Sequence, residues 1–221
     1  MSEVDFSKFN EELIAEFWQV TLEDYVIDVA WSPNRTRLAA VTVEGSVFLI
    51  EDQGDSAIST LLGQHAGGAN SLSFCPDGTE FATTGHDGLV KCWNAESGQL
   101  IAELDAGDSW VAKAVYNPLR NVLATAAGKH LKIWSDNREL SYESSDHSST
   151  IADIGWNPDG SGLAVAAYNG ITLHVPGKQN QPRKYTWKGS SLALEWSPDS
   201  KYIATGEQDS TVHFWHVKSG E

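Results

Sequence analysis

A length of 221 residues, with 41% hydrophobic and 20% charged residues, suits one large all-β domain and argues against a chain that is disordered throughout. The formal net charge of −15 at pH 7 argues against nucleic acid and anionic membranes as partners, because both would be repelled. No run of about 18 apolar residues occurs, so the sequence predicts no membrane-spanning helix.

The first residues of the chain, 1–14, are acidic and lack the basic and apolar regions of a secretory signal peptide. Phe9, Leu13, Ile14 and Phe17 lie at helical spacing, which predicts a short helix that leads into the domain. With only two cysteines in the chain, too few for a disulfide framework, we expect a cytoplasmic protein.

One pattern then recurs five times. An alternating apolar and polar stretch ends in an aromatic-x-Pro turn, a Leu-Ala type of stretch follows, and a second turn leads into a third alternating stretch. The second turn uses residues that tolerate positive φ, such as Asp87-Gly88 and Asn169-Gly170. The turn prolines are spaced by 40 to 43 residues, at Pro33, Pro76, Pro118, Pro158 and Pro198.

A fourth and more polar stretch separates consecutive repeats. These stretches read SAISTLL, GQLIAEL, RELSYES and PRKYTWK. Four strands per repeat, with the polar one outermost, describe a sheet whose inner edge is buried and whose outer edge meets water. Several such sheets arranged radially cover one another's faces.

The periodicity and the turns resemble those of the WD40-repeat β-propeller family over roughly residues 15–221. The literal Trp-Asp dipeptide is absent, since the chain has Trp93-Asn94, Trp134-Ser135 and Trp215-His216. The resemblance implies an all-β fold, a β-propeller of five four-stranded blades in a single domain over residues 15–221. The expected blades cover about residues 23–63, 64–105, 106–145, 146–187 and 188–221.

The last expected blade ends at its third strand, near Trp215. Residues 15–22, AEFWQVTL, belong to none of the inner strands of the first blade and parallel the stretch that precedes the fifth repeat. We therefore expect residues 15–22 to form the fourth strand of the last blade and close the ring, or to pair with another chain.

The resemblance also implies a buried hydrogen-bonded set in each blade: a His before strand one, a Ser or Thr on strand two, an Asp in the next turn and the Trp of strand three. We expect this set to be structural rather than catalytic, because it is buried away from any cleft. Trp187 occupies the His position of the last blade. The matching residues are His65, Thr83, Asp87 and Trp93 in the second blade and Thr205, Asp209 and Trp215 in the last.

Signals for catalysis or for metal binding are weak throughout the sequence. It contains no His-x-x-x-His or Glu-x-x-His pair, no glycine-rich phosphate loop and no nucleophile signature. Cys75 and Cys92 are expected to be packed thiols. We therefore predict no catalytic residue, no metal site and no cofactor. A hydrolase that uses carboxylates in the central channel is the enzymatic alternative, favoured only by the excess acidity.

Propellers of this type usually bind partners on their narrow face, which is built from the segments that lead into strand one and the turns that join strands two and three. Trp110, in DAGDSWVAKAV, is the expected anchor, and its alternative is a Trp packed under its own loop. No arginine maps to this face, which argues against phosphopeptide recognition. The expected contact residues are Tyr25, Asn70, His86, Trp110, Thr150, Tyr168 and Gln208.

The sequence thus predicts a non-enzymatic scaffold or adaptor that presents a rigid face to a protein or peptide partner. The alternative is a fragment or engineered piece of a larger propeller, since family members most often have seven blades. Such a piece would leave two apolar blade faces open, and these would drive self-association into a homo-oligomer.

Overall fold

The computed structural model describes residues 18–107, 110–145, 147–176 and 182–217, and all their regular structure is β-strand. The predicted helix within residues 1–14 lies outside these ranges. Over the part of the chain that is described, no helix is long and apolar enough to cross a membrane. The class predicted from the repeats, an all-β fold built from antiparallel sheets, is confirmed.

The first three sheets each contain four antiparallel strands that pair in chain order, as the repeat predicts. The first sheet has β1 (Val26–Trp31), β2 (Arg37–Thr42), β3 (Ser46–Asp52) and β4 (Ala57–Gln64). The second has β5 (Ala69–Phe74), β6 (Glu80–Gly85), β7 (Leu89–Asn94) and β8 (Leu100–Asp105). The third has β9 (Val111–Tyr116), β10 (Leu123–Ala127), β11 (His130–Trp134) and β12 (Leu140–Ser144).

The fourth and fifth repeats are joined in one five-stranded sheet. Its strands are β13 (Asp153–Trp156), β14 (Leu163–His174), β15 (Arg183–Trp196), β16 (Tyr202–Glu207) and β17 (Val212–His216). Strand β14 covers strands two and three of the fourth repeat, and β15 runs from the outer strand of the fourth repeat into strand one of the fifth.

The Asn169-Gly170 turn explains why β14 continues without a break. Both residues have positive φ, 75° and 105°, and the register of β14 with β15 shifts there as in a bulge. A side chain at Gly170 would clash with the Tyr185 carbonyl oxygen, so only glycine fits. The expected division between residues 187 and 188 therefore falls inside β15.

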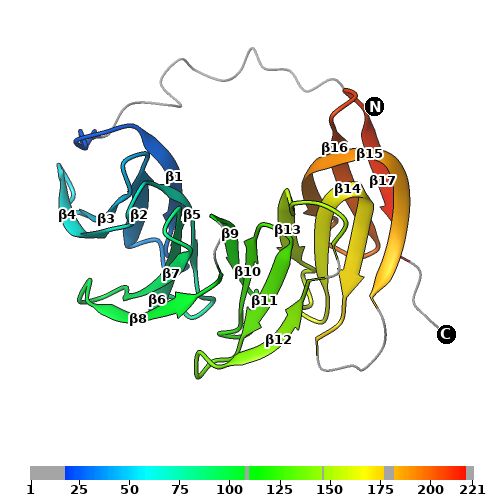
Figure 1. Cartoon of the computed structure of the whole chain (residues 1–221). Coiled ribbons are helices and arrows are strands. Elements are labelled where there is room, and N and C mark those ends of the chain that lie inside the picture. Colours follow the sequence, from blue (N-terminus) through cyan, green and yellow to red (C-terminus); the bar gives the residue numbers. More distant parts are fainter. Residues whose placement is uncertain (1–17, 108–109, 146, 177–181, 218–221) are drawn as a thin grey trace, which may run out of the picture.

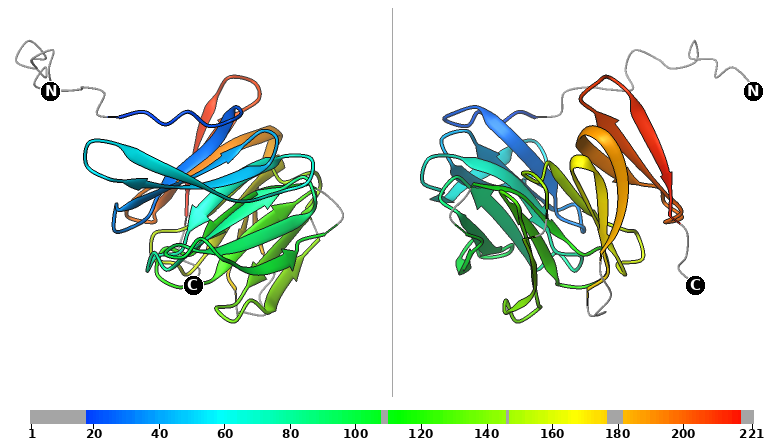
Figure 2. Two further views of the ribbon diagram at one scale, coloured as in Figure 1. Left: turned by 90° about the vertical axis from the view of Figure 1, so that its left-hand side faces the viewer. Right: turned by 45° about the vertical axis from the view of Figure 1, so that its right-hand side comes forward.

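The sheets stand side by side in an arc. Strand one of each repeat lies against strand one of the next: β1 contacts β5, β5 contacts β9, β9 contacts β13, and β13 contacts β15. Figure 1 shows the first sheet at one end of the arc and β15–β17 at the other, with an opening between them. In the right-hand view of Figure 2 the first sheet and β17 again lie on opposite sides of the molecule.

Buried apolar clusters fill the spaces between neighbouring repeats. Between the first and second sheets, Val47 and Leu49 of β3 pack with Leu72 of β5 and Phe81 of β6. Equivalent clusters join the second sheet to the third, the third to the fourth repeat and the fourth repeat to the fifth. Each repeat therefore buries its apolar face only against its neighbours, and the arc has a series of small cores rather than one.

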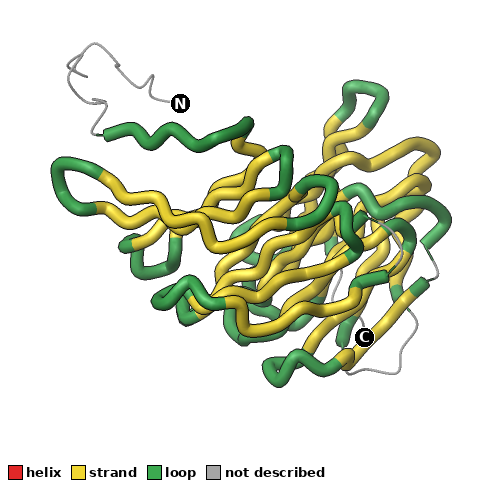
Figure 3. Tube along the Cα trace, turned by 60° about the vertical axis from the view of Figure 1, so that its left-hand side comes forward, coloured by secondary structure: helices red, strands yellow, loops and turns green. Residues whose placement is uncertain are grey.

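Residues 18–22 do not form the strand that we expected of residues 15–22. They are drawn as a loop beside the first sheet in Figure 3, and β17 stays the edge of the last sheet. The described part of the segment therefore adds no fourth strand to the last blade, and residues 15–17 lie outside the described ranges. The outer face of the first sheet is apolar and has no preceding blade, so Trp18, Val20 and Leu22 pack on it, against Ala40, Phe48 and Ile50.

Candidate protein-interaction face

A buried chain of hydrogen bonds fixes the turn between β6 and β7. Trp93 Nε1 donates to Thr83 Oγ1 at 2.9 Å, and the Thr83 hydroxyl lies 2.9 Å from His65 Nε2. His65 Nδ1 lies 3.0 Å from Asp87 Oδ1. A neutral His65 with its proton on Nδ1 gives every donor in this chain an acceptor.

Ionisation in this chain agrees with a neutral imidazole and a charged carboxylate. Burial lowers the pKa of His65 below its ordinary value, against the opposing effect of Asp87. Burial acts to raise the pKa of Asp87, but His65 and the hydrogen bonds from the Leu89 and Ala66 amides together outweigh it, and the pKa lies below its ordinary value. Asp87 also accepts hydrogen bonds from the Ala66 and Leu89 amides, so it joins the segment that leads into β5 to the turn between β6 and β7.

The last repeat uses a different acceptor for the same purpose. Trp215 Nε1 donates to Thr205 Oγ1 at 2.8 Å, and the Thr205 hydroxyl donates to Glu207 at 2.6 Å. The Ser191 hydroxyl donates to the same carboxylate at 2.9 Å. Glu207 therefore occupies the role that we had assigned to Asp209.

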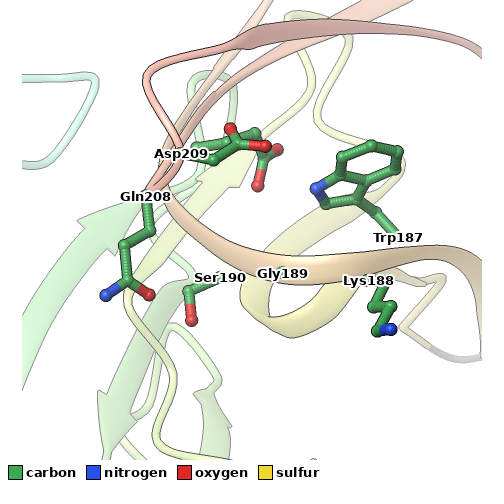
Figure 4. Close-up of a pocket in the computed structure, with 7 residues that line it drawn as sticks. Trp187, Lys188, Gly189, Ser190, Gln208 and Asp209 are labelled. Carbon is green, nitrogen blue, oxygen red and sulfur yellow. The ribbon is translucent and has the colours of Figure 1, made fainter.

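Asp209 instead caps its own turn, where it accepts from the Thr211 amide and hydroxyl. The physical reason lies at the His position, where Trp187 offers no nitrogen lone pair to Thr205. Figure 4 shows Trp187 and Asp209 on the wall of a pocket of about 190 Å³. The buried Trp187 Nε1 has no hydrogen-bond partner among the described residues, and its ring packs against His213.

The fourth repeat has a pair of buried histidines. His147 Nδ1 lies 3.1 Å from the Lys129 carbonyl oxygen, so it carries the proton. Its Nε2 then accepts from His174 Nε2 at 3.2 Å, and His174 Nδ1 accepts from the Tyr142 hydroxyl at 2.9 Å. Both rings must be neutral for this chain to form.

We expect the free energy of unfolding to fall by about 2 kcal/mol between about pH 7 and about pH 5 through His174. Burial, with His147 and Lys184 nearby, lowers the pKa of His174 to about 4. The unfolded chain therefore binds a proton between its ordinary pKa, 6.5, and about 4 while the folded chain does not, so acid destabilises the fold. Urea unfolding followed by tryptophan fluorescence measures the effect.

His174→Gln is the matched variant for this pH dependence. Its amide offers a donor and an acceptor but does not titrate. The variant should therefore lose the part of the fall in stability that His174 contributes, while His65, whose pKa is also lowered, keeps its own part. An unchanged pH slope in the variant would assign the effect to other groups.

Three of the expected contact residues form one cluster on the second and third repeats. The His86 and Trp110 rings are stacked, with centroids 3.9 Å apart and planes at 9°. His86 Nε2 lies 3.0 Å from Asn70 Oδ1, and the Asn70 amide donates to the Val111 carbonyl oxygen at 3.0 Å. Trp110 is 63% exposed, so it packs on a neighbouring repeat rather than under its own loop.

The other four contact residues lie at separate points along the same end of the arc. Backbone hydrogen bonds at this end join the turn between strands two and three of a repeat to the segment at the start of strand one. The Val43 amide donates to the Tyr25 carbonyl oxygen, His86 to Gly68, and Gln208 to Ser190. These four residues are exposed and do not contact the cluster in the structure; they are Tyr25, Thr150, Tyr168 and Gln208.

Sequence reasoning missed a buried polar network at the opposite end of the sheets. Glu80, at the start of β6, accepts from the Tyr116 hydroxyl at 2.7 Å and pairs with the Arg138 guanidinium. Burial, with Cys92 and Glu80 nearby, raises the pKa of Tyr116, and burial raises that of Cys92 to about 11. These residues are far apart in the sequence and follow no motif, so no local signal joined them.

Comparisons with known proteins agree with the repeat. The family model described as "WD domain, G-beta repeat" matches residues 56–94 and 183–216. The chain is 27% identical over 196 residues to "Telomerase protein component 1" of Rattus norvegicus, which covers 87% of this chain and 7% of that protein.

Two other relatives are similar at the same level. The chain is 26% identical to "Intraflagellar transport protein 122 homolog" of Homo sapiens, over 84% of this chain and 15% of that protein. It is also 26% identical to "Echinoderm microtubule-associated protein-like 2" of Rattus norvegicus, over 72% of this chain and 26% of that protein. This chain therefore spans about a quarter or less of the length of these three relatives. The chain therefore carries WD40 repeats at residues 56–94 and 183–216, within a fold of antiparallel sheets.

Proposed function

We propose that this chain is a non-enzymatic scaffold that binds a protein or peptide through the cluster of Asn70, His86 and Trp110. The observation that carries this proposal is the exposed Trp110 ring, which is stacked on His86 at one end of the arc. WD40 repeats generally serve as interaction scaffolds, and one relative is named as microtubule-associated.

The cluster is ordered before any partner binds. Asn70 holds His86 through a hydrogen bond and is itself held by a backbone carbonyl, so the ring under Trp110 has a fixed position. The side chains of this chain therefore lose little conformational entropy when a partner covers Trp110. A fixed aromatic side chain gains affinity in this way. The net charge of −15 favours a neutral or cationic segment as the partner, not nucleic acid or an anionic membrane.

We further propose a cytoplasmic location. Cys75 and Cys92 are both free and buried, which suits a reducing compartment.

Trp110→Ala should weaken partner binding by about 30-fold or more, the effect of removing a hot-spot residue. The measurement is a pull-down with the purified full chain, followed by titration of the captured protein or peptide against wild type and variant. Leu119→Ala is the matched control, because Leu119 is equally exposed but lies in the turn between β9 and β10, at the other end of the same sheet. Equal affinity of wild type and Trp110→Ala would contradict the proposal.

A further inference from the structure

The fifth repeat differs from the second at two neighbouring positions of its buried polar set. In the second repeat the His65 ring packs against Gly85, where any side chain would clash with it. The equivalent positions of the fifth repeat hold Trp187 and Glu207, the latter two residues after the buried Thr of strand two. A carboxylate therefore stands where the second repeat needs glycine, and the indole ring packs against His213 instead of taking the place of the imidazole.

A pocket of about 190 Å³ lies beside these two exchanged residues, between β15 and the turn that joins β16 to β17. Trp187, Glu207 and Asp209 are among the residues that line it. Figure 4 shows Trp187 and Asp209 on opposite sides of the pocket, while the Lys188 side chain is directed away from both. All the walls come from residues 187–190 and 207–209, so the pocket belongs to the fifth repeat itself.

The two carboxylates of the pocket have no cationic partner. The Thr211 hydroxyl and amide donate to Asp209, and these hydrogen bonds hold the pKa of Asp209 below its ordinary value, so that it is charged at neutral pH. Glu207 is 6% exposed, and the hydroxyls that donate to it, those of Thr205 and Ser191, are neutral. Neither carboxylate forms an ion pair with any residue in the described ranges. Such a pocket favours a cation.

We propose that this pocket binds a basic side chain, Lys or Arg, of the protein or peptide partner. The cationic group donates hydrogen bonds to the carboxylates, and its methylene stem packs on the Trp187 ring. The pocket lies at the same end of the arc as Trp110, because Gln208 in its turn holds the position that His86 holds in the second repeat. The assignment of the occupant to a partner rests on the proposed function.

Titration with N-acetyl-lysine amide tests the pocket without the partner. The purified full chain is used, and the readout is the NMR signal of the Trp187 indole N–H, assigned with Trp187→Phe. The signal should shift saturably, and added salt should weaken the binding. N-acetyl-norleucine amide has the same apolar stem without the charge, and it should bind about 5-fold more weakly or less tightly still.

Asp209→Asn is the first variant for this titration. Its amide oxygen still accepts from Thr211, so the turn keeps its cap, but the charge is lost and the lysine probe should bind about 3- to 5-fold more weakly. Glu207→Gln likewise keeps an acceptor for its two hydroxyl donors and should also weaken the probe. Asp199→Asn is the matched control, because Asp199 also caps an exposed turn, with Ser197 as a donor, but at the other end of the same sheet. It should leave binding unchanged.

Three results would each overturn the proposal: an unshifted Trp187 signal, equal binding of the lysine and norleucine probes, or equal effects of Asp209→Asn and Asp199→Asn. The outcome is separable from that of Trp110→Ala, since the probe needs no part of the Trp110 cluster. A bound probe together with unchanged partner binding by Trp110→Ala would contradict the proposed function alone. No bound probe together with weakened partner binding by Trp110→Ala would contradict the pocket alone.

Discussion

Glu80→Ala is expected to lower the free energy of unfolding by about 3 kcal/mol, because it leaves a charge and a hydroxyl without their acceptor. Glu80 is the common partner of Tyr116 and Arg138, and the three come from the second and third repeats. Its side chain is 12% exposed and that of Arg138 is 30% exposed, so the loss should lie at the low end for a buried ion pair. Urea unfolding at neutral pH measures it.

Glu51→Ala provides the matched control for this experiment. Glu51 also pairs with an arginine, Arg37, at 2.7 Å, but its side chain is 40% exposed, against 12% for Glu80, while the two arginines are similarly exposed. The same truncation on the surface should cost less than about 1 kcal/mol. Similar losses for the two variants would show that Glu80 contributes no more than a surface pair.

Glu80→Gln separates the two interactions of Glu80. The amide oxygen can still accept from the Tyr116 hydroxyl, but the charge that pairs with Arg138 is gone. The loss of stability should therefore lie between those of wild type and Glu80→Ala.

The repetitive part of the fold could be predicted from the sequence because it depends on local patterns. Alternation defines the strands, and the prolines and glycines define the turns, so the first three sheets have the predicted strand order. Each repeat contacts only its neighbours, and a local pattern repeated at a fixed period therefore carries most of the topology.

The ends of the arc could not be predicted in this way. Whether residues 18–22 pair with β17 or pack on the first sheet depends on which apolar surface lies within reach, and no local pattern contains that information. Phe48 and Ile50 lie on the face of the first sheet that has no neighbouring repeat, and Trp18 and Val20 cover them. The exchange of Asp209 for Glu207 has a similar origin, because it follows from the Trp at position 187.

The candidate site could be predicted only in part from the sequence. The position of Trp110 before strand one made it an exposed candidate, but its stacking on His86 depends on two repeats lying side by side. The Glu80 network joins residues from β6, β9 and the turn after β11, and such long-range polar contacts leave no periodic trace in one sequence.

His65→Ala is expected to lower the free energy of unfolding by about 3 kcal/mol, through a cavity and through lost hydrogen bonds. The imidazole is fully buried and joins Thr83 to Asp87. Its removal leaves the Thr83 hydroxyl, which still accepts from Trp93 Nε1, with only one acceptor for its own proton, the Lys91 carbonyl oxygen at 3.5 Å. Asp87 keeps the Ala66 and Leu89 amides, which limits the loss.

The same variant tests whether the buried chain also supports the interaction face. His86 lies directly between Gly85, which is packed against the His65 ring, and Asp87, so loosening this turn should disturb the stack of His86 on Trp110. We therefore expect His65→Ala to weaken partner binding as well as the fold. His130→Ala is the control, because His130 is half exposed and lies 3.6 Å from Glu143 on the surface. It should change neither quantity, and a His65→Ala protein as stable as this control would show that the chain from Trp93 to Asp87 does not hold the turn.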